Sequence, residues 1–461
     1  MSKSIGKPTP RLRSPRRSPG FVPPCAMLLV LFLASCAVDQ NKEVATYRAV
    51  LDQHAPASVT PPAAEEPLSL QHAFFLANQN DEQLSIRGET YLQSLISRAR
   101  AAAGFLPSFD ASARYSLSGE GSTADDSFSA SAGGSITLFN LRTLSSLEQA
   151  RTAVEQQELV LRDLQQTVLI GVAQNFFEVL RSAESVRVLE NSLSLRGEQV
   201  RDVQARTDLG IARPLDLAQA QADESSTRVS LLQARSNARQ ARTTLAFLLG
   251  LQYIDNPLAD DFTPGADTRT ALEFEQAAID HRLDLAAARK GVELASQSVT
   301  AAYRQYYPTA NLNLSFLLYS NPGDGNPWSL GASLLQPIFN AGITHQDVRD
   351  AYSGLRQAVL QQDRLARQVH EDVMLAYEDY ITSTAKLQEL EITVEAAQRA
   401  YDQAVGQYRV GNATNLDQLL ANDQLLQAQL QLINERYNRK LFYLNLLRVT
   451  GQLQLTTPSA L

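Results

Sequence analysis

Residues that could do chemistry are few in this sequence, and their spacing does not form a catalytic site. The histidines are scattered along the chain at His54, His72, His281, His345 and His370. His370-Glu371 resembles the start of a zinc-protease motif, but Met374 stands where the second histidine belongs. Neither a phosphate-binding glycine loop nor a nucleophile elbow is present. We therefore expect a protein that is not an enzyme and that binds no metal and no cofactor.

One residue is placed for covalent modification. A basic N-terminal segment with no acidic residue before Asp39 is followed by a short apolar run over residues 21–32 and then by Leu33-Ala34-Ser35-Cys36. Small residues directly before a cysteine are typical of a bacterial lipoprotein signal, in which the cysteine becomes the acylated first residue. The apolar run is too short to span a bilayer as an anchor. We predict a signal peptide over residues 1–35 and a lipid anchor at Cys36.

Cleavage would change both the charge and the cysteine content. The full sequence has 41 basic and 49 acidic residues, and residues 1–35 carry six basic residues and no acidic one, so 35 basic residues would remain. This acidity argues against nucleic acid as a partner. The two cysteines are Cys25 and Cys36, so the mature chain would have no free thiol for a disulfide, a metal or a nucleophile.

The elements that follow are duplicated at a spacing of 201 residues. Leu84 is matched by Leu285, and Gly250 by Gly451. The segment Leu209-Gly210-Ile211-Ala212 is matched by Val410-Gly411-Asn412-Ala413, and Leu215-Asp216 by Leu416-Asp417. Repeats of this length are too long for a solenoid and indicate two similar halves around a pseudo-axis.

Each half has four parts in the same order: a medium helix, a β-hairpin, a long helix without proline and a second medium helix. We place the medium helices over residues 68–104, 214–249, 271–306 and 415–450. The long helices are placed over 141–208 and 342–409, and the strands over 109–117, 128–138, 310–318 and 328–334. Pro107 and Pro308 stop the first helix of each half, while Pro214 and Asn415 suit the first turn or the cap of the last.

Helix lengths predict how these parts pack. The long helices would be about 100 Å long, and two medium helices stacked end to end match that length. Each long helix can therefore be flanked by two stacked medium ones. The predicted order is a signal peptide (1–35), a lipid-anchored strap (36–67), a first repeat (68–250), an equatorial linker (251–270), a second repeat (271–451) and a C-terminal tail (452–461).

The second long helix carries a regular apolar seam. Steps of three and four residues from Ala366 to Tyr408 meet apolar side chains at every position except Ser383. The first long helix carries a similar seam, which Asn175 and Arg196 interrupt. This spacing predicts helices laid along neighbouring helices, as in a wall, a rod or a spacer.

The alternating segments indicate a membrane and an oligomer. Strands of about ten residues fit a tilted crossing of a bilayer. Four strands cannot close a barrel, and an open edge in lipid leaves backbone groups unpaired at a cost of several kcal/mol each. Three chains would supply twelve strands, which is within the range of known barrels. A small soluble β-domain on a coiled coil is the alternative.

The duplicated half, the strand pairs and the two tip turns resemble the TolC-like outer-membrane efflux family, in particular its lipoprotein branch of OprM/NodT-like channels. The resemblance covers nearly the whole mature chain. Its most specific residues are Tyr408-Arg409-Val410-Gly411-Asn412-Ala413-Thr414-Asn415-Leu416-Asp417 and the less perfect copy Thr207-Asp208-Leu209-Gly210-Ile211-Ala212-Arg213-Pro214-Leu215-Asp216.

The resemblance implies an α+β membrane protein, a homotrimer with a long α-helical barrel and a twelve-stranded transmembrane β-barrel in outer-membrane lipid. The tip turns would dock a periplasmic adaptor linked to an inner-membrane RND pump or an ABC exporter. The residues implied in docking are Gly210, Ile211, Ala212, Pro214, Arg409, Val410, Gly411 and Asn412.

The resemblance also implies a periplasmic aperture that includes Asp417, Asp216 and Leu420. Three copies of Asp417 would form an inner ring of carboxylates, and a network of counter-charges would hold it shut. Leu420 stands where the family often has a second acidic residue, so a second ring would be apolar. For Asp208, Asp216 and Asp423 the residue types favour ordinary helix-end or exposed charges.

We expect the function of a passive exit duct that carries small molecules such as drugs and dyes out through the bacterial outer membrane. The same duct serving a type I protein-secretion system is the alternative, and a lipid-anchored coiled-coil scaffold without a pore is the third. The lipoprotein signal favours drug efflux. The residues do not indicate the transported substrate.

Overall fold

The computed structural model describes residues 38–53, 66–120, 123–265, 267–321 and 327–455. The predicted signal peptide and the lipid anchor at Cys36 lie outside these residues, as do parts of the strap and of the tail. The chain divides into two compact units, residues 1–45 and 46–461. In the first unit the structure describes the start of helix α2 (Gln40–Leu51), where Asp39 Oδ1 accepts a hydrogen bond from the Asn41 backbone N–H at 3.1 Å. The remaining elements belong to the second unit.

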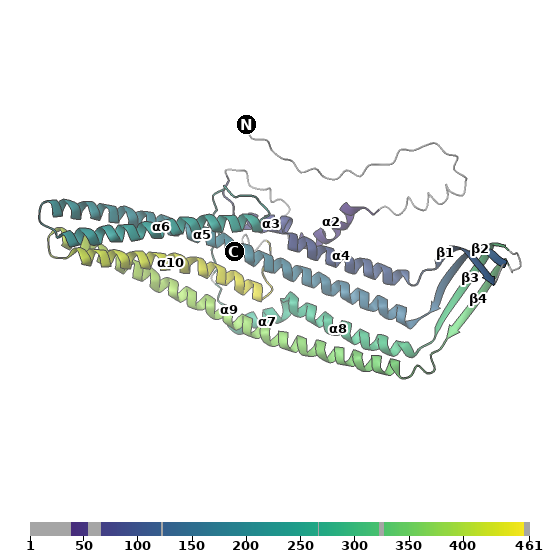
Figure 1. The fold of residues 1–461 in the computed structure, drawn as a ribbon. Helices are drawn as coiled ribbons and strands as arrows, with labels where there is room; N and C mark the ends of the chain where they lie inside the picture. The colour runs from purple at the N-terminus through teal and green to yellow at the C-terminus, as the bar shows by residue number, and fades with distance from the viewer. Residues whose placement is uncertain (1–37, 54–65, 121–122, 266, 322–326, 456–461) are drawn as a thin grey trace, which may run out of the picture. The chain divides into compact units, whose positions relative to one another are not determined.

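The second unit consists of long helices with an antiparallel sheet beyond their ends (Figure 1). The first half contains α3 (Leu70–Asn80), α4 (Glu82–Ala103), β1 (Ser108–Glu120), β2 (Thr123–Phe139), α5 (Leu141–Asp208) and α6 (Pro214–Leu248). The second half contains α7 (Ala271–His281), α8 (Leu283–Tyr303), the 3-10 turn η2 (Arg304–Tyr306), β3 (Thr309–Asn321), β4 (Trp328–Leu335), α9 (Ile343–Arg409) and α10 (Asn415–Val449). The predicted duplication and both long helices are confirmed.

The first medium helix of each half differs from the prediction, because it is two helices. Asp81 separates α3 from α4 in an extended conformation, with its backbone N–H bonded to Ala77 O and its side chain capping Leu84 N–H at 2.9 Å. Arg282, 201 residues later, separates α7 from α8 with a similar φ of −70° and ψ of 120°. The apolar periodicity continues across each break, and for this reason the sequence pattern did not reveal it.

Two glycines let the chain after α6 and after α10 approach these breaks closely. Gly250 and Gly451 have φ values of 68° and 71°. A Cβ on Gly250 would lie 2.6 Å from Asn80 Cβ, and one on Gly451 would lie 2.4 Å from His281 O. In the first half α6 and the α3–α4 pair therefore stack end to end along α5, as the lengths predicted (Figure 1).

The sheet joins the two halves. Its order is β1-β2-β3-β4 and all neighbours are antiparallel, so the predicted hairpins are confirmed and β2 also pairs with β3. The strands are longer than predicted. The pairing of β2 with β3 is irregular next to Ala130, where the register passes from Leu317 to Tyr319 and skips Leu318. Leu318 was predicted to continue the alternation, and the bulge interrupts it there.

Aromatic side chains pack the segment between the two halves (residues 251–270) against the long helices. Phe177 of α5 contacts Phe262 of that segment with ring centroids 6.0 Å apart, and Tyr380 of α9 contacts Tyr443 of α10 at 5.3 Å. Asp260 pairs with Lys440, and burial together with the Asp260 charge raises the pKa of Tyr437 to about 12.

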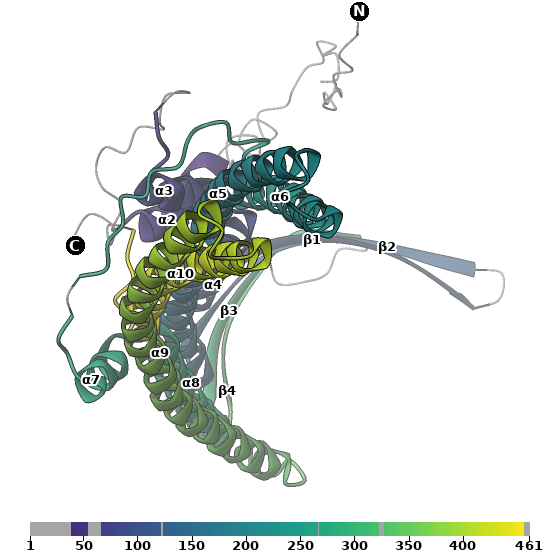
Figure 2. The same cartoon turned by 90° about the vertical axis from the view of Figure 1, so that its left-hand side faces the viewer.

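Seen along their length, the helices of the second unit form a curved layer (Figure 2). Among the helices that the structure describes, none combines the length and the apolar character needed to cross a membrane.

Candidate functional site

One face of the sheet carries hydroxyl groups that bond across the strands. Serines of β1 and β2 pair at 2.8–3.0 Å, namely Ser108 with Ser135, Ser112 with Ser131 and Ser116 with Ser127. Ser315 of β3 pairs in the same way with Ser329 of β4 at 2.9 Å. Asp110 and Arg114 lie on this face of β1, where Asp110 stands opposite Gly133 and Arg114 opposite Ser129. The face is suited to water.

The opposite face is apolar, and its large side chains are left exposed by the part of the chain that the structure describes. Phe109 is 79% exposed and Leu334 is 72% exposed, and Tyr115, Trp328 and Leu330 are also exposed. Apolar side chains gathered on one exposed face mark a surface that lipid or another chain covers. β1 and β4 are the edge strands, each with a partner on one side only among the strands described. The sheet therefore has two unlike faces and two open edges.

The two tip turns share one backbone geometry. Gly210 and Gly411 follow the long helices with φ values of 71° and 82°, and a Cβ at either would meet nothing within 4 Å. Ile211 N–H bonds to Arg206 O at 2.8 Å and Asn412 N–H to Gln407 O at 2.9 Å. These are the bonds of a Schellman helix end, which needs a left-handed residue.

The residues predicted to dock a partner lie at these turns. Gly210, Ile211, Val410, Gly411 and Asn412 are exposed between the helices, and Ala212 is half-buried. Arg409 is the last residue of α9, and Pro214 is the first residue of α6, as predicted. Leu209, Ile211 and Val410 expose at least 70% of their surface. The most exposed side chains of the tip turns are therefore apolar.

Asp417 lies in the first turn of α10, where it caps the helix. Its Oδ2 accepts hydrogen bonds from Thr414 N–H at 2.8 Å and from Thr414 Oγ1–H at 2.7 Å. These bonds hold the pKa of Asp417 below its usual value. Thr414 is the N-cap residue, so the predicted cap at Asn415 is wrong. Asn415 is instead buried, and its side-chain amide forms hydrogen bonds with α5 and α6.

Asp216 takes the equivalent place at the start of α6, but a cation accompanies it. Arg213 Nη2 lies 2.8 Å from Asp216 Oδ1, and the side-chain bonds from Arg213 lower the pKa of Asp216. Asn415 Nδ2 donates to Asp216 O at 3.1 Å and so joins the first turns of α10 and α6. Leu420 is half exposed one turn beyond Leu416 on α10. The structure thus brings the predicted aperture residues to one end of the helices.

Sequence reasoning missed a buried cation near this end. Arg196 of α5 pairs with Asp223 of α6 and lies 2.5 Å from Asp423 of α10. Asp423 is therefore not an ordinary exposed charge, whereas Asp208 accepts a solvent-exposed hydrogen bond from Gln204 at 2.7 Å. The available signal was the interruption of the apolar seam at Arg196.

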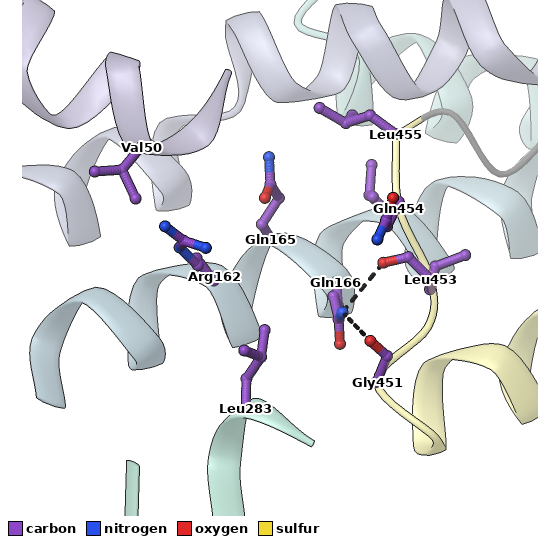
Figure 3. Close-up of a pocket in the computed structure, with 10 residues that line it drawn as sticks. Val50, Arg162, Gln165, Gln166, Leu283, Gly451, Leu453, Gln454 and Leu455 are labelled. Atoms are coloured by element: carbon purple, nitrogen blue, oxygen red, sulfur yellow. Dashed lines mark hydrogen bonds between the residues drawn. The ribbon is translucent and has the colours of Figure 1, made fainter. Parts of the chain in front are cut away.

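Figure 3 shows a pocket between α5, α8 and the C-terminal segment, lined by Arg162, Gln165, Gln166, Leu283 and Leu453 among others. Gln166 Nε2 donates to Gly451 O at 3.3 Å and to Leu453 O at 3.1 Å. Gln165 Nε2 donates to Leu51 O at 2.7 Å. These amides bind backbone carbonyls of the chain itself, so the pocket marks where the end of α2 and the segment after α10 are attached to α5.

Known proteins resemble this chain along most of its length. The family described as outer membrane efflux protein matches residues 91–251 and 275–452, that is, both halves. The outer membrane efflux protein BepC of Brucella suis biovar 1 (strain 1330) is 26% identical over 68% of this chain and 69% of its own length. The outer membrane protein TolC of Vibrio cholerae serotype O1 is 23% identical over 84% of this chain and 91% of its own length.

The fold has solved counterparts as well. The outer membrane protein VceC from Vibrio cholerae superposes with a TM-score of 0.73 at 20% identity, over 83% of this chain and 96% of VceC. The expected resemblance to TolC-like efflux proteins and the expected location in the outer membrane are confirmed. Since the family match covers both copies of the repeat, the chain belongs to the outer membrane efflux protein family.

Proposed function

We propose that this outer-membrane efflux protein is the passive exit duct of a tripartite system that removes small molecules from the cell. The observation that carries the proposal is the four-stranded sheet, with one hydroxyl-bearing face, one exposed apolar face and two open edges. Such a sheet satisfies its backbone in lipid only when further strands close it. The lengths of α5 and α9, at 1.5 Å per residue, give the duct a wall of about 100 Å.

The proposed assembly is a homotrimer. β1 of one copy would pair with β4 of the next, and three copies would give twelve strands around a water-filled interior. The hydroxyl face with Asp110 and Arg114 would line that interior, because charged side chains in a membrane barrel belong on the lumen side. The apolar face with Phe109 and Leu330 would meet outer-membrane lipid.

The surface of α9 supports the same assembly. Val369, Val373, Ala376, Tyr380 and Ser383 are buried in the single chain. The seam positions from Leu387 to Tyr408 are only half-buried. A seam of regular spacing that its own chain covers only in part is suited to packing against a neighbouring copy.

The tip turns are the proposed docking surface for a periplasmic adaptor, which would link the duct to an inner-membrane RND pump or an ABC exporter. Their exposed apolar side chains and their distance from the sheet support this. Gly411→Pro should impair docking, because proline fixes φ near −65° while this residue has a φ of 82°. Unchanged crosslinking of the variant to the adaptor would contradict the placement.

The aperture and the lipid anchor complete the proposal. Asp417, Asp216 and Leu420 would narrow the duct at its periplasmic end. Cys36 would carry the lipid. Replacing Cys36 by serine should abolish incorporation of labelled palmitate and leave conductance intact, since the anchor takes no part in the pore.

Conductance in planar lipid bilayers tests the duct itself. Purified protein should run as a trimer that heat dissociates, and it should form ion-conducting channels. A stable protein without conductance would instead support the coiled-coil scaffold. Deletion of the gene should sensitise cells to dyes and drugs. A secretion defect without such sensitivity would favour the type I secretion alternative.

A further inference from the structure

Charged side chains are scarce on the hydroxyl-bearing face of the sheet. Where β1 pairs with β2, from Ser108 to Ser116, the charged residues on this face are Asp110 and Arg114, and the others are serines and Gly133. The positions of β3 and β4 that pair on this face carry threonine, asparagine, serine, glycine or leucine. One acidic and one basic side chain therefore supply the charge of this face in the pairs that the structure describes.

These two charges are kept apart. Asp110 and Arg114 are four residues apart along β1, about 13 Å at 3.3 Å per residue. A Cβ on Gly133 would lie 3.6 Å from Asp110 Oδ1, so the carboxylate lies across the strand and over this glycine of β2. In water at physiological ionic strength, charges are largely screened from one another beyond about 8 Å. Asp110 therefore does not neutralise Arg114.

Hydroxyl groups surround Arg114 instead. Ser129 of β2 stands opposite it, and Ser112 and Ser116 flank it on the same face of β1. The two flanking hydroxyl groups are already bonded to serines of β2, at 3.0 and 2.8 Å. Among the described residues no carboxylate pairs with Arg114. Its guanidinium donors are therefore available to a ligand.

The neighbouring copy in the proposed trimer would not change these surroundings. The free edge of β1 would lie beside β4 of that copy, whose described residues on the same face include Ser329, Gly331 and Ser333. None of the described positions of β4 on this face is acidic, whatever register the two strands take. Threefold symmetry would place three copies of Arg114 at one level of the barrel.

We propose that Arg114 determines the selectivity of the outer section of the duct, where three copies attract an anionic group of the transported molecule. Rings of arginine or lysine favour anions in pores. A guanidinium can also bind two oxygens of a carboxylate, phosphate or sulfonate at once. This role rests on the function proposed above, because it requires the closed barrel.

The Arg114 ring would be opposite in sign to the Asp417 ring and would lie at the other end of the duct. A small ion of either sign would meet one ring that repels it. A molecule with both a cationic and an anionic group would meet an attractive ring at each end. The two rings together therefore favour zwitterionic cargo over simple salts.

Ion selectivity in planar bilayers tests the ring. The permeability ratio of potassium to chloride is obtained from the reversal potential in a gradient of potassium chloride. Arg114→Gln should raise this ratio about threefold, the effect of removing a potential of about one kT. Arg114→Lys keeps the charge and should keep the ratio. Asp110→Asn removes the opposite charge from the same face and should lower it.

Binding of an anionic group is tested with inorganic pyrophosphate. Pyrophosphate should reduce the potassium current of the wild type at about a tenfold lower concentration than that of Arg114→Gln, because the variant lacks the bidentate partner. Equal sensitivity of the two channels would show that Arg114 does not bind the anion.

Charged thiol reagents reverse the change on the same channel. Arg114→Cys would hold the sole cysteine after Cys36. A thiosulfonate reagent that attaches an ammonium group should return the permeability ratio to the wild-type value, and one that attaches a sulfonate should raise it further. Ala113→Cys, the adjacent residue on the apolar face, should respond to neither reagent, because lipid would cover it.

The outcomes separate the ring from the duct. Arg114→Gln channels with the wild-type permeability ratio, or Arg114→Cys channels that respond alike to both reagents, would overturn the role of Arg114 while leaving the duct intact. Wild-type trimers that form no channels would instead overturn the proposed function.

Discussion

The tip halves of α5 and α9 are copies of one repeat, yet they are packed differently. On α5 the positions Leu189, Ser192, Arg196, Gln199 and Val203 are all buried. The positions 201 residues later on α9 are Leu390, Thr393, Ala397, Ala400 and Ala404, and none of them is buried. The first copy thus packs inside its own chain against α6 and α10, while the second leaves its seam for contacts outside the chain.

The charged residues at the two tips also differ between the halves. Arg213 accompanies Asp216 in the first half, whereas Thr414 takes that place beside Asp417 and supplies no charge. Arg196 has Ala397 as its counterpart. The two tips therefore share one backbone geometry, but the first tip carries an ion pair beside its carboxylate and the second carries a hydroxyl there.

The largest effect is expected when a carboxylate is introduced into the seam of α5 or of α9. Val203→Asp should destabilise the chain by about 3 kcal/mol or more, because it buries a charge without a partner. Ala404→Asp, its counterpart, should leave the helices intact and reduce trimer formation. Circular dichroism on heating and trimer yield on gels measure the two effects. Equal loss of helical signal in both variants would contradict the difference in packing.

The tip carboxylates should differ in their effect on the channel. Asp417→Ala should raise single-channel conductance and weaken cation preference, since none of the described cationic side chains pairs with Asp417. Asp216→Ala should change the conductance and the cation preference by less, because Arg213 already pairs with that carboxylate. If Asp417→Ala channels conduct as little in the closed state as the wild type does, Asp417 is not part of the aperture.

The pH dependence sharpens the same comparison. Hydrogen bonds hold the pKa values of Asp417 and Asp216 below the ordinary value. Both groups therefore stay charged as the pH falls, and they lose their charge only below the range in which a free aspartate titrates, about pH 4. The reversal potential should be constant between about pH 7 and pH 5. A shift that begins within that range would point to other groups.

The backbone of the two tips should respond alike. Gly210→Ala and Gly411→Ala should each destabilise the chain by about 1 kcal/mol, because alanine is disfavoured at positive φ and neither site is crowded. Urea unfolding of the two variants provides the measurement. Unequal losses would mean that the two turns, and not their side chains alone, have diverged.

The smallest expected effect concerns the contact between α5 and α9. The Arg206 guanidinium carbon lies 4.7 Å from the centre of the Tyr408 ring. Tyr408→Leu keeps an apolar side chain and removes this interaction, which is worth about 0.5–1 kcal/mol at an exposed site. The same substitution in an Arg206→Gln background should have no further effect. A double-mutant cycle on thermal stability measures the coupling.

Periodicity along the chain predicted most of the fold. The proline-free seams gave α5 and α9, and the alternation of apolar and polar residues gave the strands, because both patterns extend over many residues. The breaks at Asp81 and Arg282 were missed, since a single capping residue leaves the surrounding period unchanged. The bulge at Leu318 was missed for a similar reason, because it depends on pairing with another strand.

The candidate site was predicted less completely. The tip glycines could be located because a left-handed helix end leaves a glycine in the sequence. The ion pairs of Arg196 could not, because Arg196, Asp223 and Asp423 are far apart in the sequence and meet only when the two halves pack together. The sequence recorded Arg196 only as an interruption of a seam. Thr414 was overlooked as a cap because its neighbour Asn415 is of a type that is preferred over threonine at this position.

The most direct test of the central claim, that the sheet lies in lipid as part of a pore shared between copies, is thiol labelling of β4 in intact outer membranes. Ser329→Cys and Leu330→Cys are adjacent residues on opposite faces, and the sequence after Cys36 has no other cysteine. A water-soluble maleimide should label Ser329→Cys and reduce conductance, while Leu330→Cys should resist the reagent because lipid covers it. Equal labelling of both residues would show that water reaches both faces and would contradict the account.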